Sequence, residues 1–105
     1  MLDVTHNASH HQFEADTPAG LAFAAYERKG ATVVFTHTEV PEEAEGQGVA
    51  SALTRAALDW ARTEGLSVVP MCPFFAAYMA RHRETHDLVR EADRKWLDPD
   101  YDEKR

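Results

Sequence analysis

The sequence predicts a single α/β (α+β) sandwich. We expect an antiparallel three-stranded meander plus a parallel fourth strand, two main helices and a short C-terminal helix. Three observations predict this fold. Alternating and β-branched segments joined by short turns occupy the first forty residues. A loop with proline and glycine then leads into a long amphipathic helix, and a short apolar segment follows it. A strand–helix–strand connection of this kind makes its two strands parallel.

The first part of the chain predicts the meander. Residues 10–16 alternate between apolar and polar side chains, and residues 21–28 form the next strand after a turn. A hairpin at Gly30 joins this strand to a third over residues 31–40. Pro41 ends the third strand, because proline cannot donate a hydrogen bond to a neighbouring strand.

The second part of the chain predicts helices around one short strand. The long helix covers residues 47–64 and ends before Gly65, a residue type favoured just after a helix. Residues 66–71 are almost wholly apolar, as expected for a strand covered on both faces. A second helix begins with proline and covers residues 73–83, and a short helix follows over 87–96.

Length and composition exclude several classes of protein. We expect one domain over residues 1–105, with 1–9 and 97–105 as loose ends. A formal net charge of −7 opposes binding to nucleic acid or to an anionic membrane, and mildly favours a cationic partner such as an amine. The single cysteine, Cys72, excludes an internal disulfide and indicates a reducing cytoplasm. The apolar runs are too short for a signal peptide or a transmembrane helix.

The loop before the long helix has the features of a phosphate-binding site. The first backbone N–H groups of a helix lack intrahelical partners and carry a partial positive charge. Glycines in front of them remove side chains that would keep an anion at a distance. A glycine-assisted turn without a ligand is the alternative. The predicted binding residues lie at the end of the third strand and in the loop: Val40, Gly46, Gln47, Gly48, Val49, Ala50 and Ser51.

The spacing of the loop distinguishes among nucleotide-binding motifs. A P-loop is excluded because no GK[ST] follows Gly48, and the dinucleotide fingerprint is incomplete because Ser51 occupies its third small position. From Glu45 to Ala50, however, the loop resembles the acyl-CoA pyrophosphate loop of the GNAT acetyltransferases, [RQ]-x-x-G-x-[GA]. The segments VVFTHTEVP and PMCPFFAAY extend the resemblance, which is to the small, single-domain YjdJ-type branch, over roughly residues 10–88. Glu45 departs from the pattern, since a carboxylate cannot donate to a phosphate.

This resemblance implies a compact, truncated GNAT fold whose third and fourth strands splay apart around the acyl chain of acetyl-CoA. It implies an acetyl-CoA-dependent N-acetyltransferase that transfers an acetyl group by direct attack of a primary amine, on a small molecule or a protein. No metal is expected. Only about twenty residues follow the second helix. The acceptor site is therefore expected to be shallow or to be completed by a second subunit in a homodimer.

Four residues are candidates for the chemistry. Cys72 precedes the proline of the second helix and is therefore placed at its N-cap, where a thiol can become more nucleophilic. We expect it to line the acetyl pocket rather than to be the nucleophile. Tyr78 resembles the tyrosine that protonates the departing CoA thiolate, but an ordinary core aromatic is equally consistent. His37 and Glu39 share a face of the third strand and could accept the proton of an ammonium group, or be simply solvated.

Other functions stay open at this point. A non-catalytic sensor of CoA or acyl-CoA would share the loop but lack an acceptor site, and a protein-interaction domain would bind no cofactor. His82 and His86 are four residues apart and could both reach a metal on a continuous helix. Without thiolate partners, we expect them to be exposed histidines.

Overall fold

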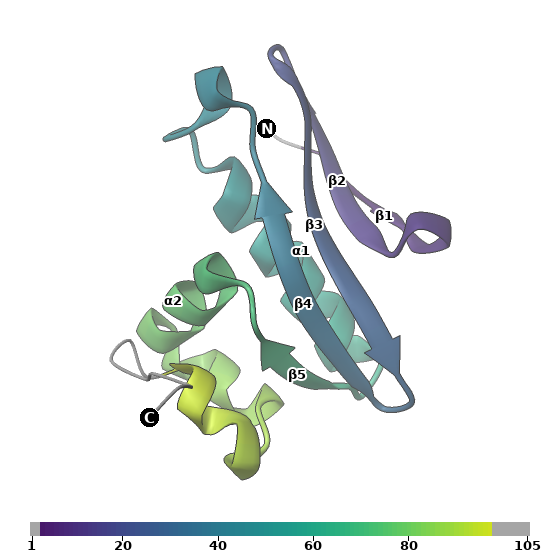
Figure 1. Cartoon of the computed structure of the whole chain (residues 1–105), viewed down its shortest axis with the longest axis vertical. Coiled ribbons are helices and arrows are strands. Elements are labelled where there is room, and N and C mark those ends of the chain that lie inside the picture. Colours follow the sequence, from purple (N-terminus) through teal and green to yellow (C-terminus); the bar gives the residue numbers. More distant parts are fainter. Residues whose placement is uncertain (1–2, 98–105) are drawn as a thin grey trace.

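Five strands form one sheet in the computed structural model, which describes residues 3–97 (Figure 1). The strands lie in sequence order across the sheet, with β1–β4 antiparallel and β5 parallel to β4. Their bounds are β1 Val4–Asn7, β2 Gln12–Thr17, β3 Gly20–Lys29, β4 Thr32–Glu39 and β5 Ser67–Pro70. The mixed sheet and its parallel crossover confirm the α+β fold expected from the sequence.

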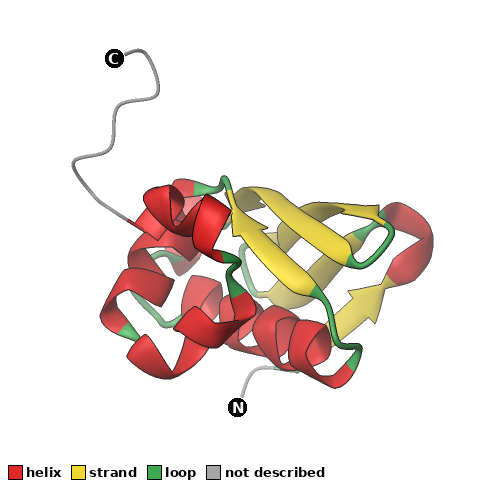
Figure 2. Ribbon diagram, turned by 90° about the horizontal axis from the view of Figure 1, so that it is seen from below, coloured by secondary structure: helices red, strands yellow, loops and turns green. Residues whose placement is uncertain are grey.

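In the part of the chain that the structure describes, two α-helices and four 3₁₀ segments connect and cover the strands. The helices are α1 Val49–Thr63 and α2 Pro73–Arg81, and the 3₁₀ segments are η1 Ala8–His10, η2 Glu42–Ala44, η3 Arg83–Leu88 and η4 Glu91–Leu97. Helix α1 crosses the sheet and contacts all five strands, whereas α2 contacts β4 and β5. Figure 2 shows most of the helical segments along the lower and left sides of the sheet, with a short one at its right end.

The two helices pack on the same face of the sheet. Tyr26 and Phe35 are cross-strand partners, so their side chains share a face. The Tyr26 ring lies 5.0 Å from the Trp60 ring of α1, and the Phe35 ring stacks on Phe75 of α2 at 4.3 Å. On α1, Leu53 is one of several residues of the core-facing stripe that are fully buried. This burial matches the amphipathic pattern that predicts the helix.

The first strand is a correction to the sequence-based prediction. Residues 1–9 are expected to be loose, yet Val4–Asn7 forms β1 and pairs with β2, which makes the meander four-stranded. A segment with a single apolar residue gives no periodic signal, and it is held instead by cross-strand pairing and by the His6 ring. The next strand begins at Gln12 rather than His10, because His11 adopts a left-handed turn conformation (φ +53°). Residues 98–105 of the other predicted loose end lie outside the described residues.

The second half differs in two further respects. Strand β5 lies at the edge of the sheet and alternates between buried and half-buried residues, so it is not covered on both faces as expected. In place of one helix over residues 87–96, two 3₁₀ segments flank Val89, whose backbone is extended (φ −104°, ψ 122°). Helix α2 ends at Arg81 because His82 is already non-helical (φ −121°, ψ 84°).

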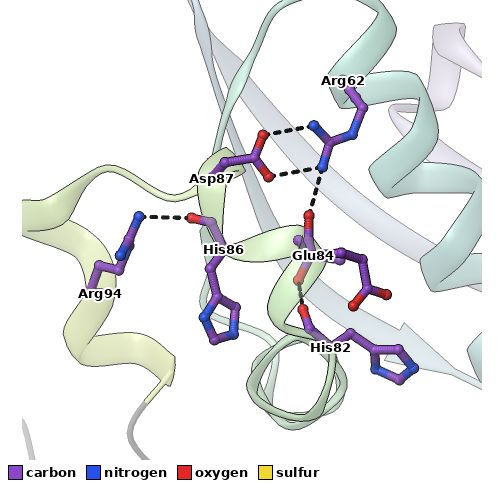
Figure 3. Close-up of polar contacts among 7 residues, drawn as sticks. Arg62, His82, Glu84, His86, Asp87 and Arg94 are labelled. Atoms are coloured by element: carbon purple, nitrogen blue, oxygen red, sulfur yellow. Dashed lines mark hydrogen bonds and ion pairs between the residues drawn. The ribbon is translucent and has the colours of Figure 1, made fainter.

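Arg62 of α1 binds the segment that follows α2 (Figure 3). The Arg62 guanidinium donates to both carboxylate oxygens of Asp87, at 2.7 and 2.9 Å, and to the Glu84 carbonyl at 3.0 Å. Arg94 of η4 donates to the His86 carbonyl at 3.1 Å. The pairing with Arg62 lowers the pKa of Asp87. These polar contacts therefore hold η3 to α1, and η4 to η3.

Candidate functional site

A bulge in β4 decides which of its side chains face the helices. Ala25 pairs with His37 and Tyr26 pairs with Phe35, so Thr36 is an extra residue without a partner in β3. Side chains of a regular strand alternate between the faces, and one extra residue reverses that alternation. Phe35 lies in the core, whereas beyond the bulge His37 is on the opposite face of the sheet.

The residues that follow the bulge on the helix side are Thr38 and Val40. Both line a cleft with a volume of about 470 Å³ between the end of β4, the loop before α1 and the start of α2. The residues lining the cleft are Thr38, Val40, Ala44, Glu45, Gly46, Gly48, Val49, Ala50, Ser51 and Phe74. None of these is basic, and Glu45 is the charged side chain among them.

The loop presents unpaired backbone N–H groups to this cleft. Gly46 and Gly48 have left-handed conformations (φ +81° and +80°), which glycine adopts without strain. Gly48 is the N-cap of α1, and the Ala52 N–H makes the first helical bond, to the Gly48 carbonyl at 3.0 Å. The N–H groups of residues 49–51 therefore have no intrahelical partner, and no side chain caps them. The arrangement is suited to a phosphate.

The structure brings together six of the seven residues predicted to bind the cofactor. Gln47 is the exception, since it is not among the residues lining the cleft. Its amide points back to the Glu43 carbonyl at 3.4 Å, and it lines a neighbouring hollow beside Pro18. A ligand role for the other six stays a prediction. Thr38, Ala44 and Phe74 line the cleft without having been proposed for it from the sequence.

Cys72 occupies the N-cap of α2, as the sequence predicts, with Pro73 as the first helical residue. Its N–H donates to the Phe35 carbonyl at 2.8 Å, and its Sγ lies 3.3 Å from the Thr38 Oγ1. Cys72 is only 3% exposed and does not line the cleft itself. The thiol therefore lies behind Thr38, on the protein side of the cleft wall.

The structure places the other three candidates away from the cleft. Tyr78 is buried, stacks on His82 at 3.9 Å, and lines a separate hollow of about 240 Å³ between α1, α2 and η3. His37 and Glu39 form a pair, with 3.0 Å between Nε2 and Oε2, and their side chains are 60% and 65% exposed. The bulge puts this pair on the face opposite Thr38.

His82 and His86, near the end of α2, have a structural role. The ring of His82 donates from Nδ1 to the Tyr78 carbonyl, and the ring of His86 donates from Nε2 to the Met79 carbonyl, both at 2.7 Å. Both are half-buried, so the expectation of exposed histidines is wrong. The His82 ring thereby satisfies a carbonyl that the helix terminus leaves without a backbone donor, whereas the Met79 carbonyl also accepts the His82 backbone N–H at 3.0 Å.

Within residues 3–97, no group of three histidine, cysteine or acidic side chains is arranged to hold a metal ion. No helix in that same range is long and apolar enough to cross a membrane.

Comparison with known families assigns the class of protein. A model of the GCN5-related N-acetyl-transferase family matches residues 12–88, from the start of β2 to the end of η3. That range contains the bulge, the loop and the cleft, and the chain belongs to this family. Acyl transfer is the general chemistry of the family. A comparison of the chain with curated proteins finds no match. The YjdJ-type branch stays a prediction.

Proposed function

We propose that this protein is an acetyl-CoA-dependent N-acetyltransferase that transfers an acetyl group to a primary amine by direct attack. The observation that carries the proposal is the cleft at the start of α1, where unpaired N–H groups of residues 49–51 follow two left-handed glycines. A Cβ built on Gly46 or Gly48 would meet no atom within 4 Å, so both glycines border open space. The loop therefore fits a pyrophosphate, and family membership supports CoA as its carrier.

The proposed binding mode relies on the backbone. No basic side chain lines the cleft, and Glu45 adds a negative charge at its rim. The positive end of the α1 dipole and its N–H groups would then hold the pyrophosphate without help from a cation. The apolar stretch formed by Val40 and Phe74 would cover the arm that links the pyrophosphate to the acyl group. Bound acetyl-CoA supplies the reactive thioester.

For the acceptor side we propose the opposite face of β4. The pairing of β4 with β5 ends at Phe35 and Pro70, so the last residues of β4 have no partner in β5. The His37–Glu39 pair lies on that stretch and is exposed, which supports it as the acceptor of the ammonium proton. The net charge of −7 favours a cationic amine. Tyr78 lines a different hollow, so the proposal gives it no part in protonating the thiolate.

Binding and turnover test the proposal separately. CoA at a hundredfold excess over its Kd should stabilise the fold by about 2.7 kcal/mol. For a domain of this size, that raises the Tm by roughly 10–20 °C. Free-thiol release from acetyl-CoA, with and without a panel of primary amines, then measures transfer. Binding with no amine-dependent release would indicate a CoA or acyl-CoA sensor, and an unmoved melting curve would exclude both the enzyme and the sensor.

A further inference from the structure

Thr38 is a polar side chain on the strand side of the cleft, across from the loop. The bulge at Thr36 turns it toward the helices, and it lines the cleft with Phe74 and the loop residues. The other hydroxyl in the lining, that of Ser51, belongs to the first turn of α1 and so to the phosphate end. A ligand whose pyrophosphate lies at the loop would therefore direct its opposite, acyl-bearing end toward Thr38.

The hydroxyl of Thr38 is held in place by Cys72. Its Oγ1 lies 3.3 Å from Cys72 Sγ, and either group can donate in this contact. Cys72 is itself fixed, because its N–H donates to the Phe35 carbonyl at 2.8 Å and it caps α2. A hydroxyl has one donor and two lone pairs, so the contact with sulfur leaves hydrogen-bonding capacity for a ligand. A β-branched side chain also has few rotamers, which keeps this hydroxyl oriented.

We infer that the Thr38 hydroxyl binds the acyl-thioester end of an acyl-CoA, and that Cys72 is a positioning residue that orients this hydroxyl. The inference rests on the proposed function and adds a residue to it. A hydroxyl that donates to the thioester carbonyl stabilises the negative charge that develops there when an amine attacks. No covalent bond to Cys72 forms. The thiol is 3% exposed and lies behind Thr38, so the acyl group meets the hydroxyl before it can reach the sulfur.

The first test compares ligands that share the phosphate end. Acetyl-CoA and the fragment 3′-phospho-ADP, which lacks the arm and the acyl group, are titrated calorimetrically into the parent protein, Thr38→Val and Thr38→Ser. Thr38→Val should weaken acetyl-CoA binding by about fivefold to tenfold, the loss expected for one hydrogen bond, and leave the fragment within about twofold. Thr38→Ser keeps the hydroxyl and should restore most of the affinity. Thr38→Ala is a second variant if Thr38→Val does not fold.

The second test addresses Cys72 as a positioning residue. Cys72→Ala should weaken acetyl-CoA by about twofold to threefold and leave the fragment unchanged, since the sulfur acts only through Thr38. Cys72→Ser keeps a donor and an acceptor and should restore binding. In the double variant with Thr38→Val, the removal of Cys72 should add nothing, because the two changes break one contact. A purely structural cysteine would lower the affinity for both ligands in parallel.

Three results would overturn the inference. Equal binding of acetyl-CoA by the parent and Thr38→Val would show that the hydroxyl does not touch the acyl end. Loss of all transfer in Cys72→Ala with unchanged acetyl-CoA binding would indicate a nucleophilic thiol. A parent protein that binds neither acetyl-CoA nor 3′-phospho-ADP would overturn the proposed function as well, which distinguishes that failure from the other two.

Discussion

The imidazole Nε2 of His6 lies 2.6 Å from the phenolic oxygen of Tyr26. The same imidazole stacks on Phe13 at 4.3 Å and meets the edge of Trp60 at 4.7 Å between ring centroids. Strand β1 is thus joined to β3 and α1 by one side chain. Burial lowers the pKa of His6, and the charge of Glu64 only partly opposes this effect. Burial likewise raises the pKa of Tyr26. Both groups are therefore neutral in the folded protein near pH 7.

We expect His6 to make the fold less stable in mild acid. The unfolded imidazole has the ordinary pKa of about 6.5, whereas the folded one has a lower pKa. Between these two pKa values the unfolded state binds more protons than the folded state does. The contribution of His6 to stability is therefore complete above about pH 6.5 and declines as the pH falls toward the folded pKa. Urea unfolding of the parent and His6→Phe from about pH 8 to about pH 5 measures this. The difference between the two curves should depend on pH, and a constant difference would contradict the expectation.

We expect a large loss of stability when either ring of the Phe35–Phe75 pair in the core is removed. The two rings stack at 4.3 Å with an interplanar angle of 15°, and both residues are 0% exposed. Phe75→Ala should therefore cost about 3–5 kcal/mol, from lost burial and from the cavity left behind. Phe74→Ala is the matched control one residue earlier, on a half-buried ring that lines the cleft. Denaturant unfolding should give Phe74→Ala a clearly smaller loss, and equal losses would mean that Phe74 belongs to the core.

The fold was predictable wherever its determinants are close together in the sequence. The order of strand, glycine loop and helix around Gly48 follows from local signals, and so does the N-cap position of Cys72 before a proline. Strand β1 was not predictable, because a segment with one apolar residue becomes a strand only when β2 and the ring of Trp60 are present. The edge position of β5 depends likewise on which strands surround it, and its apolar sequence does not contain that information.

The site was predictable only up to the bulge. Strict alternation from Phe35 puts His37 on the same face as Phe35, and thereby on the side of the helices. The extra residue, Thr36, reverses this and presents Thr38 to the cleft instead. A bulge is a property of the pairing between two strands. The register shift between Ala25 and Tyr26 cannot be recognised from the sequence of β3 or of β4 alone. The loop residues were found because glycine spacing before a helix is a local pattern.

We expect Cys72 to react slowly with thiol reagents in the folded protein. Its thiol is 3% exposed, so labelling requires a local or global opening. Labelling in water should be at least about a hundredfold slower than in strong denaturant. The control is Met71→Cys in a Cys72→Ala background, since Met71 is 49% exposed and adjacent in the chain. Mass spectrometry over time should show fast modification of the control. Rapid modification of the parent would mean that the sulfur is accessible and would reopen its role as a nucleophile.

A pair of glycines separates ligand binding from backbone geometry. Gly48 is the N-cap of α1, and Gly65 follows the C-terminal end of that helix. Both have a left-handed φ (+80° and +69°), and a Cβ on either would meet no atom within 4 Å. Alanine at either position should therefore cost a similar amount, roughly 1–2 kcal/mol of stability, for the left-handed backbone. Of these two glycines, Gly48 lines the cleft and Gly65 does not. Gly48→Ala should therefore also lose affinity for CoA, whereas Gly65→Ala should not.

Gly48→Asn completes this design, because asparagine tolerates a left-handed backbone while its side chain occupies the space in front of the helix. It should unfold at nearly the parent temperature and still bind CoA much more weakly, which calorimetry and circular dichroism on the same sample measure together. Gly65→Asn should match the parent in both respects. If Gly48→Asn binds CoA as tightly as Gly65→Asn does, the pyrophosphate lies elsewhere, and the left-handed glycine serves only the turn into α1.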